Sequence, residues 1–348
     1  MRIAVVGATG NVGTAVLRRL HRAAGERENA GFGPLSLTGI ARRTPDTAAE
    51  PYRGVHWHGL DVGTDSGRTK LTAALEGSDA VVHLAWAIQP NRDEAAMYRT
   101  NVTGTANVLH AAADAGVQHI VCASSVGAYS AADKEFRRDE SWPTGGIPTS
   151  HYSRHKAEQE GLLDRFEADH PDRLVTRLRP GLIFQPDAGS EIGRYFLGPL
   201  IPKVVLGRIP LPLIPIPARL IFQAVHADDV ADAYWRVVEQ RAPGAFNIAA
   251  EPEITPARVA EVLGARRVLN IPVGVLRALV ALSWGAGLQR TDPGWIDMAA
   301  LAPVMDTSRA RTVLGWSAEH SSRDALAAVI DGLRSGDGLE GSPNLYPR

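Results

Sequence analysis

A short apolar run that leads directly into three evenly spaced glycines constrains this chain most. Residues 2–6 are largely apolar, and Gly7, Gly10 and Gly13 follow, before apolar residues recur at helical spacing up to Leu20. Glycine permits a tight turn and lets the backbone approach a bound group, and a helix N-terminus attracts phosphate. The pattern predicts a strand, turn and helix that hold the pyrophosphate of a dinucleotide. The residues expected to contact it are Gly7, Thr9, Gly10, Asn11, Val12 and Gly13.

The first half of the chain repeats this order of strand and helix. Apolar runs that predict strands lie at 35–40, 55–60, 80–84, 120–123 and 174–178, with helical patterns at 66–75, 98–115 and 152–168. Strands that are apolar along their length and separated by helices are typical of a parallel sheet covered on both faces. We therefore predict an α/β fold, a Rossmann-type doubly wound parallel sheet.

The alternation breaks down after Pro180, where proline and glycine become dense. A helical pattern at 228–240 and a short strand pattern at 246–248 indicate that the chain then returns to the sheet. We expect a dinucleotide-binding domain over 1–184 plus about 221–251. A smaller, discontinuous C-terminal substrate lobe would cover about 185–220 plus 252–335, and a flexible tail 336–348.

Composition and charge exclude several classes of function. The 37 Lys and Arg balance 38 Asp and Glu, so no excess of positive charge marks a nucleic-acid partner. Cys122 is the single cysteine, which excludes an internal disulfide and fits a reducing compartment. Prolines and basic residues interrupt the apolar stretch 195–225, and the histidines lack metal-ligand spacing. We expect a cytoplasmic protein with no membrane span and no metal site.

Tyr152, Lys156 and Ser125 form the candidate catalytic group. Tyr152 and Lys156 lie four residues apart, so on a helix they share a face. A tyrosine with its usual pKa near 10 needs a nearby cation to act as an acid or base at neutral pH, and Lys156 would supply it. Ser125 follows the strand at 120–123, at the sheet edge where ligands bind. Such a pair is often ordinary surface, but the glycine loop and the serine favour catalysis.

The GxxGxxG spacing of residues 7–13 resembles the motif of the extended short-chain dehydrogenases/reductases, the NAD-dependent epimerase/dehydratase family. Asp61-Val62, His83-Leu84-Ala85-Trp86, Asn101 to Thr105 and Val225 to Ala231 resemble further family motifs in the family's order. The likeness extends from Met1 to about Trp316. Trp86 departs from the family's pattern, which has alanine at that position.

The resemblance implies hydride transfer between a nicotinamide and a carbonyl or alcohol carbon, with proton transfer through Tyr152. It assigns the serine role to Ser125, with Ser124 as the alternative, and gives Lys156 a hydrogen bond to the cofactor ribose. Asn101 would relay a proton through water, or simply cap a helix. It also implies a possible homodimer through the helices at 98–115 and 152–168. The remaining cofactor contacts it implies are Asp61, Val62, Leu84, Ala85, Trp86 and Pro180.

The end of the second strand bears on the choice of cofactor. NAD users commonly place an acidic residue there for the ribose 2′-hydroxyl, whereas a 2′-phosphate favours arginine. Here Arg42 and Arg43 follow the strand, although loop arginines are also common surface charges. We expect NADP(H) in preference to NAD(H).

The lobe must determine the substrate, because family membership alone does not. Ile, Leu, Pro and Phe dominate residues 192–222, and 273–284 is a second apolar stretch. These stretches favour a small apolar carbonyl substrate, although the second stretch can equally be packing of the lobe. A nucleotide-sugar epimerase or dehydratase is the alternative function. A redox sensor that binds the dinucleotide without catalysis is the third, and it would be expected to lack the tyrosine or the lysine.

Overall fold

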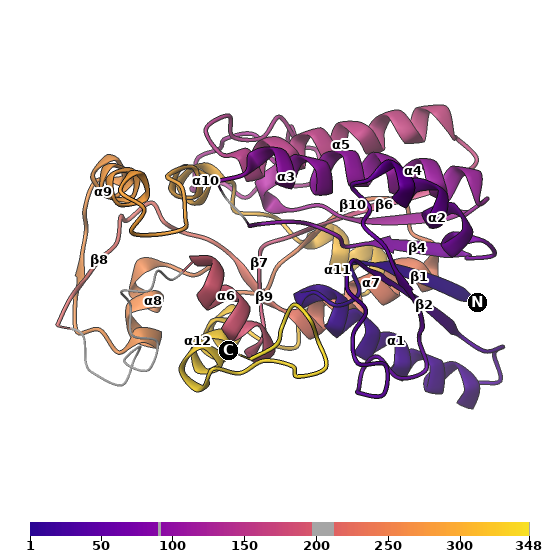
Figure 1. The fold of residues 1–348 in the computed structure, drawn as a ribbon. Coiled ribbons are helices and arrows are strands. Elements are labelled where there is room, and N and C mark those ends of the chain that lie inside the picture. Colours follow the sequence, from indigo (N-terminus) through magenta and orange to yellow (C-terminus); the bar gives the residue numbers. More distant parts are fainter. Residues whose placement is uncertain (90–91, 197–211, 348) are drawn as a thin grey trace.

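The computed structural model describes residues 1–89, 92–196 and 212–347, so part of the lobe expected over 185–220 lies outside the described residues (Figure 1). Seven parallel strands form the central sheet in the order β3-β2-β1-β4-β5-β6-β10. This order confirms the predicted α/β, Rossmann-type class. The strands are β1 Arg2–Val6, β2 Ser36–Ala41, β3 His56–Gly59, β4 Ala80–His83, β5 His119–Ala123, β6 Leu174–Pro180 and β10 Gly244–Ile248.

Helices cover both faces of the sheet, as its apolar strands require (Figure 1). On one face, α1 (Asn11–Asn29) and α7 (Ala227–Gln240) pack against each other and share a buried cluster with β1 and β10. The other face is covered by α2 (Asp65–Leu75), α4 (Gly104–Asp114) and α5 (His151–Asp169), with a separate cluster. A short helix, α3 (Glu94–Tyr98), and a π-helical turn, η1 (Arg99–Thr103), precede α4.

A second, smaller body lies at the carboxyl end of the strands, at the left of Figure 1. Two small parallel strand pairs form part of it, β7 with β9 and β8 with β11. None of the helices among the described residues is both long and apolar enough to cross a bilayer. The elements are β7 Leu182–Phe184, η3 Pro186–Ala188, α6 Gly189–Phe196, β8 Ile214–Pro215, β9 Ala224–His226, α8 Pro256–Leu263, β11 Val268–Leu269, α9 Val273–Gly285 and α10 Gly294–Leu301.

The end of the expected lobe departs from its predicted boundary. Helix α11 (Ser308–Leu314) packs on α7 and β10, and Trp316 is buried in the core of the sheet domain. The indole Nε1 of Trp316 donates a hydrogen bond of 2.9 Å to the carbonyl of Asp229. Residues 308–316 therefore pack with the sheet and not with the lobe. Helix α12 (Ser322–Ser335) packs against β7, β9 and α6.

The segment expected to be a flexible tail packs onto the glycine loop. Ser342 is 1% exposed and Leu345 is fully buried. The hydroxyl of Ser342 donates to the carbonyl of Thr9 at 2.9 Å and accepts from the amides of Asn344 and Leu345. A compact turn satisfies these polar groups, and such hydrogen bonding leaves no trace in the hydrophobic pattern of the sequence.

Candidate active site

The glycine loop joins β1 to α1 with the backbone in close contact on two sides. Gly7 has a φ of +89°, and a Cβ there would lie 2.6 Å from the amide nitrogen of Ala85. A Cβ on Gly13 would lie 2.4 Å from the carbonyl oxygen of Gly7. The amide of Gly7 donates to the carbonyl of Ile40 at 2.8 Å. Glycine is therefore required at both positions by the junction of β1, β2 and β4.

The start of α1 offers its amide groups to a bound anion. Gly10 is the N-cap residue, no side chain caps the helix, and its first turn holds no acid. A Cβ on Gly10 would meet only the carbonyl of Gly7, at 3.6 Å. Asn11 turns its side chain toward the lobe, where it donates to the carbonyl of Ile183 at 3.2 Å and accepts from Gln185 at 2.7 Å. The loop therefore fits a diphosphate, held by backbone groups at a helix N-terminus.

Ser125 begins a 3₁₀ turn, η2 (Val126–Ala128), directly after β5. Its hydroxyl oxygen accepts a hydrogen bond of 3.0 Å from the amide of Gly127, so the hydroxyl proton can point elsewhere. The neighbouring Ser124 donates its proton to the carboxylate of Glu160. The two adjacent serines thus have different partners, and Ser125 is the one that lowers the pKa of Tyr152.

Tyr152 lies in the first turn of α5, between two tryptophans. Its ring is 5.7 Å from that of Trp86, edge to face, and 5.0 Å from that of Trp295 on α10. Burial raises the pKa of Tyr152, and the hydrogen bond with Ser125 lowers it in part. The net pKa stays above its ordinary value near 10, so the phenol is protonated at neutral pH.

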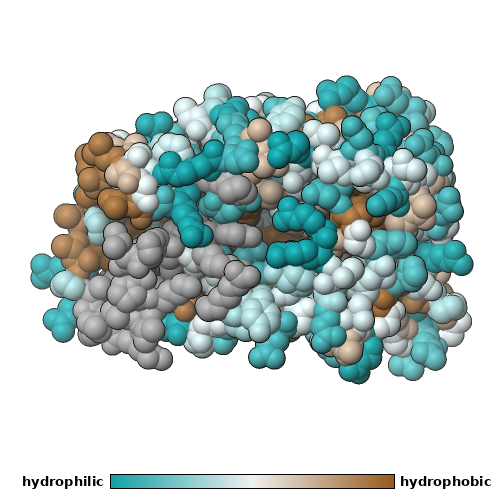
Figure 2. Space-filling model, in the orientation of Figure 1, coloured by the Kyte–Doolittle hydropathy of each residue, from teal (hydrophilic) through white to brown (hydrophobic). Residues whose placement is uncertain are grey.

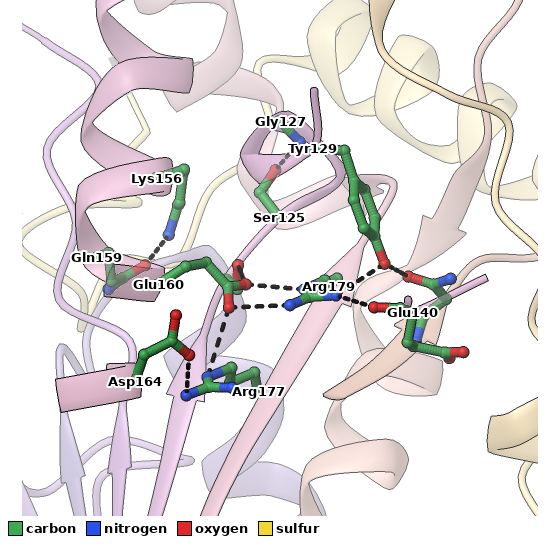
Figure 3. Close-up of polar contacts among 12 residues, drawn as sticks. Ser125, Gly127, Tyr129, Glu140, Lys156, Gln159, Glu160, Asp164, Arg177 and Arg179 are labelled. Atoms are coloured by element: carbon green, nitrogen blue, oxygen red, sulfur yellow. Dashed lines mark hydrogen bonds and ion pairs between the residues drawn. The ribbon is translucent and has the colours of Figure 1, made fainter. Parts of the chain in front are cut away.

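Lys156 is 2% exposed and points toward the end of β5 (Figure 3). Its ammonium donates to the carbonyl of Ala123 at 2.6 Å and to Gln159 at 3.0 Å. The same nitrogen lies 3.4 Å from the centroid of the Trp86 ring. Burial lowers the pKa of Lys156 to about 7. Trp86 lies against the side chains of both Lys156 and Tyr152, and the assignment of Lys156 as the group that lowers the pKa of Tyr152 stays a prediction.

A buried ion pair lies beneath this group (Figure 3). Glu160, one turn after Lys156, accepts two hydrogen bonds from Arg179 on β6, at 2.8 and 3.0 Å. Arg177 adds an ion pair at 3.4 Å, and Arg179 also donates to the hydroxyl of Tyr129. Burial opposes ionisation of Glu160, but the contacts with Arg179 outweigh it, and the pKa of Glu160 falls. The network fixes α5 against β6 and the segment after β5.

Asn101 lies in the π-helical turn and holds the loop that carries Trp86. Its carbonyl oxygen accepts from the amide of Ala87 at 2.7 Å, and its side-chain nitrogen donates to the carbonyl of Ala87 at 2.9 Å. This geometry positions the loop after β4, where Leu84, Ala85 and Trp86 follow one another. The carboxylate of Asp61 accepts from the amide of Gly63 at 2.9 Å.

Pro180 and Val62 lie farther along the same edge of the sheet. Pro180 ends β6 beside Ile248 of β10, and Val62 is 6% exposed. The structure therefore brings the predicted residues of β1, β4, β5 and β6 to one edge of the sheet.

Arg42 and Arg43 lie exposed after β2, and Arg43 contacts the C-terminal segment. Arg43 donates to the carbonyl of Pro343 at 3.3 Å and to the side-chain oxygen of Asn344 at 3.2 Å. Asn344 in turn donates to the hydroxyl of Thr9 at 3.2 Å. Two of the predicted cofactor residues, Thr9 and Arg43, are thus joined through a segment more than 300 residues away.

Sequence reasoning missed three parts of this site. Trp295 reaches Tyr152 from a distant helix, and no local pattern marks it. The contacts of Ser342 and Asn344 also depend on the fold alone. Gln159 was detectable in principle, since it lies one helical turn after Lys156 on the same face.

The family model for the NAD dependent epimerase/dehydratase family matches residues 3–249. An uncharacterized protein of Mycobacterium tuberculosis is 27% identical over 335 residues, which cover 94% of this chain and 30% of that protein. The chain therefore spans about a third of the length of the first curated relatives it matches.

Two shorter matches carry functional names. The NAD-dependent glucose-6-phosphate dehydrogenase of Haloferax volcanii is 32% identical over 136 residues, covering 36% of this chain and 52% of that protein. A 4-hydroxy-2-methyl-3-oxo-4-farnesyl-3,4-dihydroquinoline-1-oxide ketoreductase of Stigmatella aurantiaca is 31% identical over 126 residues, covering 36% and 37%.

Among solved structures, the dTDP-glucose 4,6-dehydratase DesIV of Streptomyces venezuelae, with NAD bound, is similar in fold. It gives a TM-score of 0.68 at 21% identity, over 96% of this chain and 97% of that one. Its likeness shows the shared architecture of sheet and lobe. Because the family model covers most of the chain, this protein belongs to the NAD-dependent epimerase/dehydratase family.

Proposed function

We propose that this protein is a nicotinamide-dependent oxidoreductase that reduces a carbonyl group of a small apolar molecule. The observation that carries the proposal is the place of Tyr152, a half-buried phenol between Trp86 and Trp295 whose pKa burial raises. A phenol that keeps its proton at neutral pH can donate it to an oxygen that gains negative charge. Reduction of a carbonyl group creates such an oxygen.

The cofactor, when bound, supplies the hydride. Its diphosphate would lie at the start of α1, where a Cβ on Gly10 would meet only the carbonyl of Gly7 and no side chain caps the helix. Asp61, Val62 and Pro180 are proposed to line the remainder of the cofactor site. We propose NADP(H), because Arg42 and Arg43 follow β2 and no acid stands there.

The chain's own residues would handle the oxygen and the proton. Ser125 and Tyr152 direct their hydroxyls to the carbonyl oxygen, and Tyr152 transfers its proton to that oxygen. Lys156, with a pKa of about 7, can exchange a proton near neutral pH, and Ala123 and Gln159 hold its position. Asn101 would act by holding the loop with Trp86, through its two bonds to Ala87.

The surroundings of Tyr152 support an apolar substrate. The indoles of Trp86 and Trp295 flank its ring, so the approach to the phenol is aromatic. The ketoreductase relative is named for a farnesyl-bearing quinoline, and the Haloferax relative for a sugar phosphate.

The second candidate is epimerisation or dehydration of a nucleotide sugar. Its support is the fold shared with the dTDP-glucose 4,6-dehydratase over nearly the whole chain. A non-catalytic redox sensor is less favoured, because Tyr152 and Lys156 are both present.

A cofactor titration followed by one substitution tests the proposal. We expect at least tenfold tighter binding of NADPH than of NADH, about 1.4 kcal/mol, measured by fluorescence. In a panel of apolar aldehydes and ketones, Tyr152→Phe should lower kcat/KM by about 10²–10⁴ and leave cofactor binding unchanged. Tyr98→Phe, which removes a hydroxyl from a 40% exposed ring, is the matched control.

Two results would contradict the proposal. If Tyr152→Phe reduces as fast as the wild type, the tyrosine is not the proton donor. A protein that prefers NADH and converts a nucleotide sugar without net use of cofactor would place epimerisation first.

A further inference from the structure

Helix α9 is apolar, yet none of its residues is buried. Its sequence, VGVLRALVALSWG, contains a single charged residue, Arg277. A helix of this composition is normally stabilised by burying at least one apolar face. Among the described residues no element covers the outer face of α9, so its exposure calls for a functional explanation.

The exposed side chains of α9 form one stripe. Val275, Leu279 and Leu282 are 47%, 57% and 72% exposed, and their spacing of four and three residues places them on the same face. On another side of the helix, Arg277 bonds the carboxylate of Asp297 on α10 at 2.8 Å. The helix is therefore fastened to the lobe through α10, and the stripe points away from that contact.

Three further exposed apolar residues of the lobe lie on β11, next to β8 and after the end of α9. Leu288 follows α9 and is 52% exposed, Leu269 of β11 is 50% exposed, and Leu213, next to β8, is 44% exposed. The strands β8 and β11 are paired, which keeps Leu213 and Leu269 in one small region. We call these six residues the lobe-tip patch. Figure 2 shows the apolar side chains gathered at the end of the molecule where Figure 1 places α9.

Within the chain segments that carry the lobe-tip patch every charged residue is an arginine, although Glu261 and Asp292 stand at the two ends of residues 262–291 and Asp297 contacts Arg277. Residues 262–291 contain four arginines and no Asp or Glu, and residues 212–227 add Arg219, again without an acid. All 38 acidic residues and 32 of the 37 basic ones therefore lie elsewhere in the chain. Arg277 is neutralised by Asp297. The exposed arginines are Arg219, Arg266, Arg267 and Arg290.

We propose that the lobe-tip patch docks onto the surface of a membrane that contains anionic lipids. Leucine and valine side chains beside arginines are the composition of segments that lie in the lipid interface. The apolar stripe would enter the boundary of the acyl chains, and the arginines would bind the lipid phosphates. Helix α9, with 13 residues, is about 20 Å long. It is too short to cross a hydrocarbon layer of about 30 Å, so it lies along the surface.

The lobe-tip patch is one helix away from the candidate active site. Helix α10 packs on α9 and carries Trp295, whose ring is 5.0 Å from that of Tyr152. Arg92, beyond the loop of Trp86, bonds the carbonyl of Trp284 and lies 4.5 Å over its ring. Docking would therefore bring the approach to Tyr152 close to the lipid surface. This consequence rests on the proposed function, whereas docking itself does not.

Flotation of the full chain with lipid vesicles tests the proposal without any activity measurement. We expect the protein to float with phosphatidylcholine vesicles that contain about 30% phosphatidylglycerol, and to bind pure phosphatidylcholine at least tenfold less. Leu279→Glu with Leu282→Glu should reduce the bound fraction at least tenfold. The matched control, Phe32→Glu with Val313→Glu, adds the same charges at positions 62% and 48% exposed elsewhere and should bind as the wild type does.

A second variant separates charge from apolar contact. Arg266→Ala with Arg267→Ala should weaken binding to the anionic vesicles and reduce its dependence on salt. Absence of wild-type flotation would overturn the proposal, as would an equal loss in the matched control. A wild type that is dimeric by light scattering and becomes monomeric in the Leu279 and Leu282 variant, with no vesicle binding, would instead assign the patch to a second copy.

Discussion

The cluster around Lys156 and the lobe-tip patch differ in which side chains are exposed to water. Lys156, Glu160 and Arg179 are 2%, 1% and 5% exposed, so charged groups are buried in the sheet domain. At the lobe tip, Leu269, Leu279 and Leu282 are 50–72% exposed, so apolar groups face outward. Each arrangement costs free energy, because a buried charge loses its hydration and an exposed apolar group orders water.

The two regions differ in what they contribute to the folded structure. The buried charges have hydrogen-bond partners at 2.6–3.0 Å, so they fix the geometry of the strand ends where Ser125 and Tyr152 lie. The lobe-tip patch contributes little to folding, because burial is what stabilises apolar groups. Its exposure among the described residues agrees with the proposed membrane contact, and stability measurements can distinguish the two regions.

The largest effect is expected at the buried ion pair. Glu160→Gln would leave the guanidinium of Arg179 without its carboxylate, at a cost of about 3–5 kcal/mol in the free energy of unfolding. Urea denaturation measures this cost. Glu261→Gln, which removes a 53% exposed partner of Arg323, should change the free energy by less than about 1 kcal/mol. Equal losses in both variants would mean that water reaches Glu160.

Removal of the buried ammonium should act in the opposite direction. The folded-state pKa of Lys156, about 7, lies below the value of about 10.4 in an unfolded chain, so the unfolded state binds more protons between these pH values. This group therefore destabilises the fold below pH 7, and the penalty disappears as the pH rises toward 10.4. Lys156→Met should stabilise the protein by about 2 kcal/mol at pH 6, while abolishing activity.

The pH dependence of the difference between wild type and Lys156→Met is the measurement. Thermal unfolding at several pH values from 6 to 10 should show the gain shrink as the pH rises. A gain that is constant with pH would mean that packing, and not charge, accounts for it. The buried ammonium of Lys156 would then not account for a loss of stability in the folded state.

The sequence predicted the sheet well, because the signals for it are local. Apolar runs marked the strands, and the spacing of Tyr152 and Lys156 placed both on α5. The neighbours of these side chains were not predictable in the same way. Trp86 was visible as a departure from the family's alanine, but its position over Lys156 results from the loop held by Asn101. Trp295 comes from a helix more than 140 residues away.

The lobe and the C-terminal segment were predicted less well, for a related reason. Residues 308–316 looked like an extension of the lobe, but Trp316 bonds the carbonyl of Asp229 and packs in the sheet domain. The polar composition of residues 336–348 favoured a flexible tail. Ser342 satisfies its polar groups within a turn against Thr9, and a hydropathy pattern cannot show this.

The C-terminal segment offers an intermediate case, a buried hydroxyl without charge. Ser342→Ala would leave the carbonyl of Thr9 and the amides of Asn344 and Leu345 without this partner, at a cost of about 1–2 kcal/mol. Ser335→Ala, at the end of α12, removes a hydroxyl that bonds only within its own helix and is the control. Denaturation with urea measures both, and an unchanged wild-type midpoint for Ser342→Ala would mean that the segment does not pack on the loop in solution.

The smallest effect on folding is expected at the lobe-tip patch. Leu282→Ser changes a side chain that is 72% exposed, so the free energy of unfolding should shift by less than about 0.5 kcal/mol. Leu17→Ala, in the core beneath β1, should cost about 2–5 kcal/mol and sets the scale for a buried leucine. Measured without lipid, a cost for Leu282→Ser close to that of Leu17→Ala would show that the stripe is covered in solution by another copy of the chain. A negligible cost, together with weaker binding to anionic vesicles, would mean that Leu282 serves the membrane contact and not the fold.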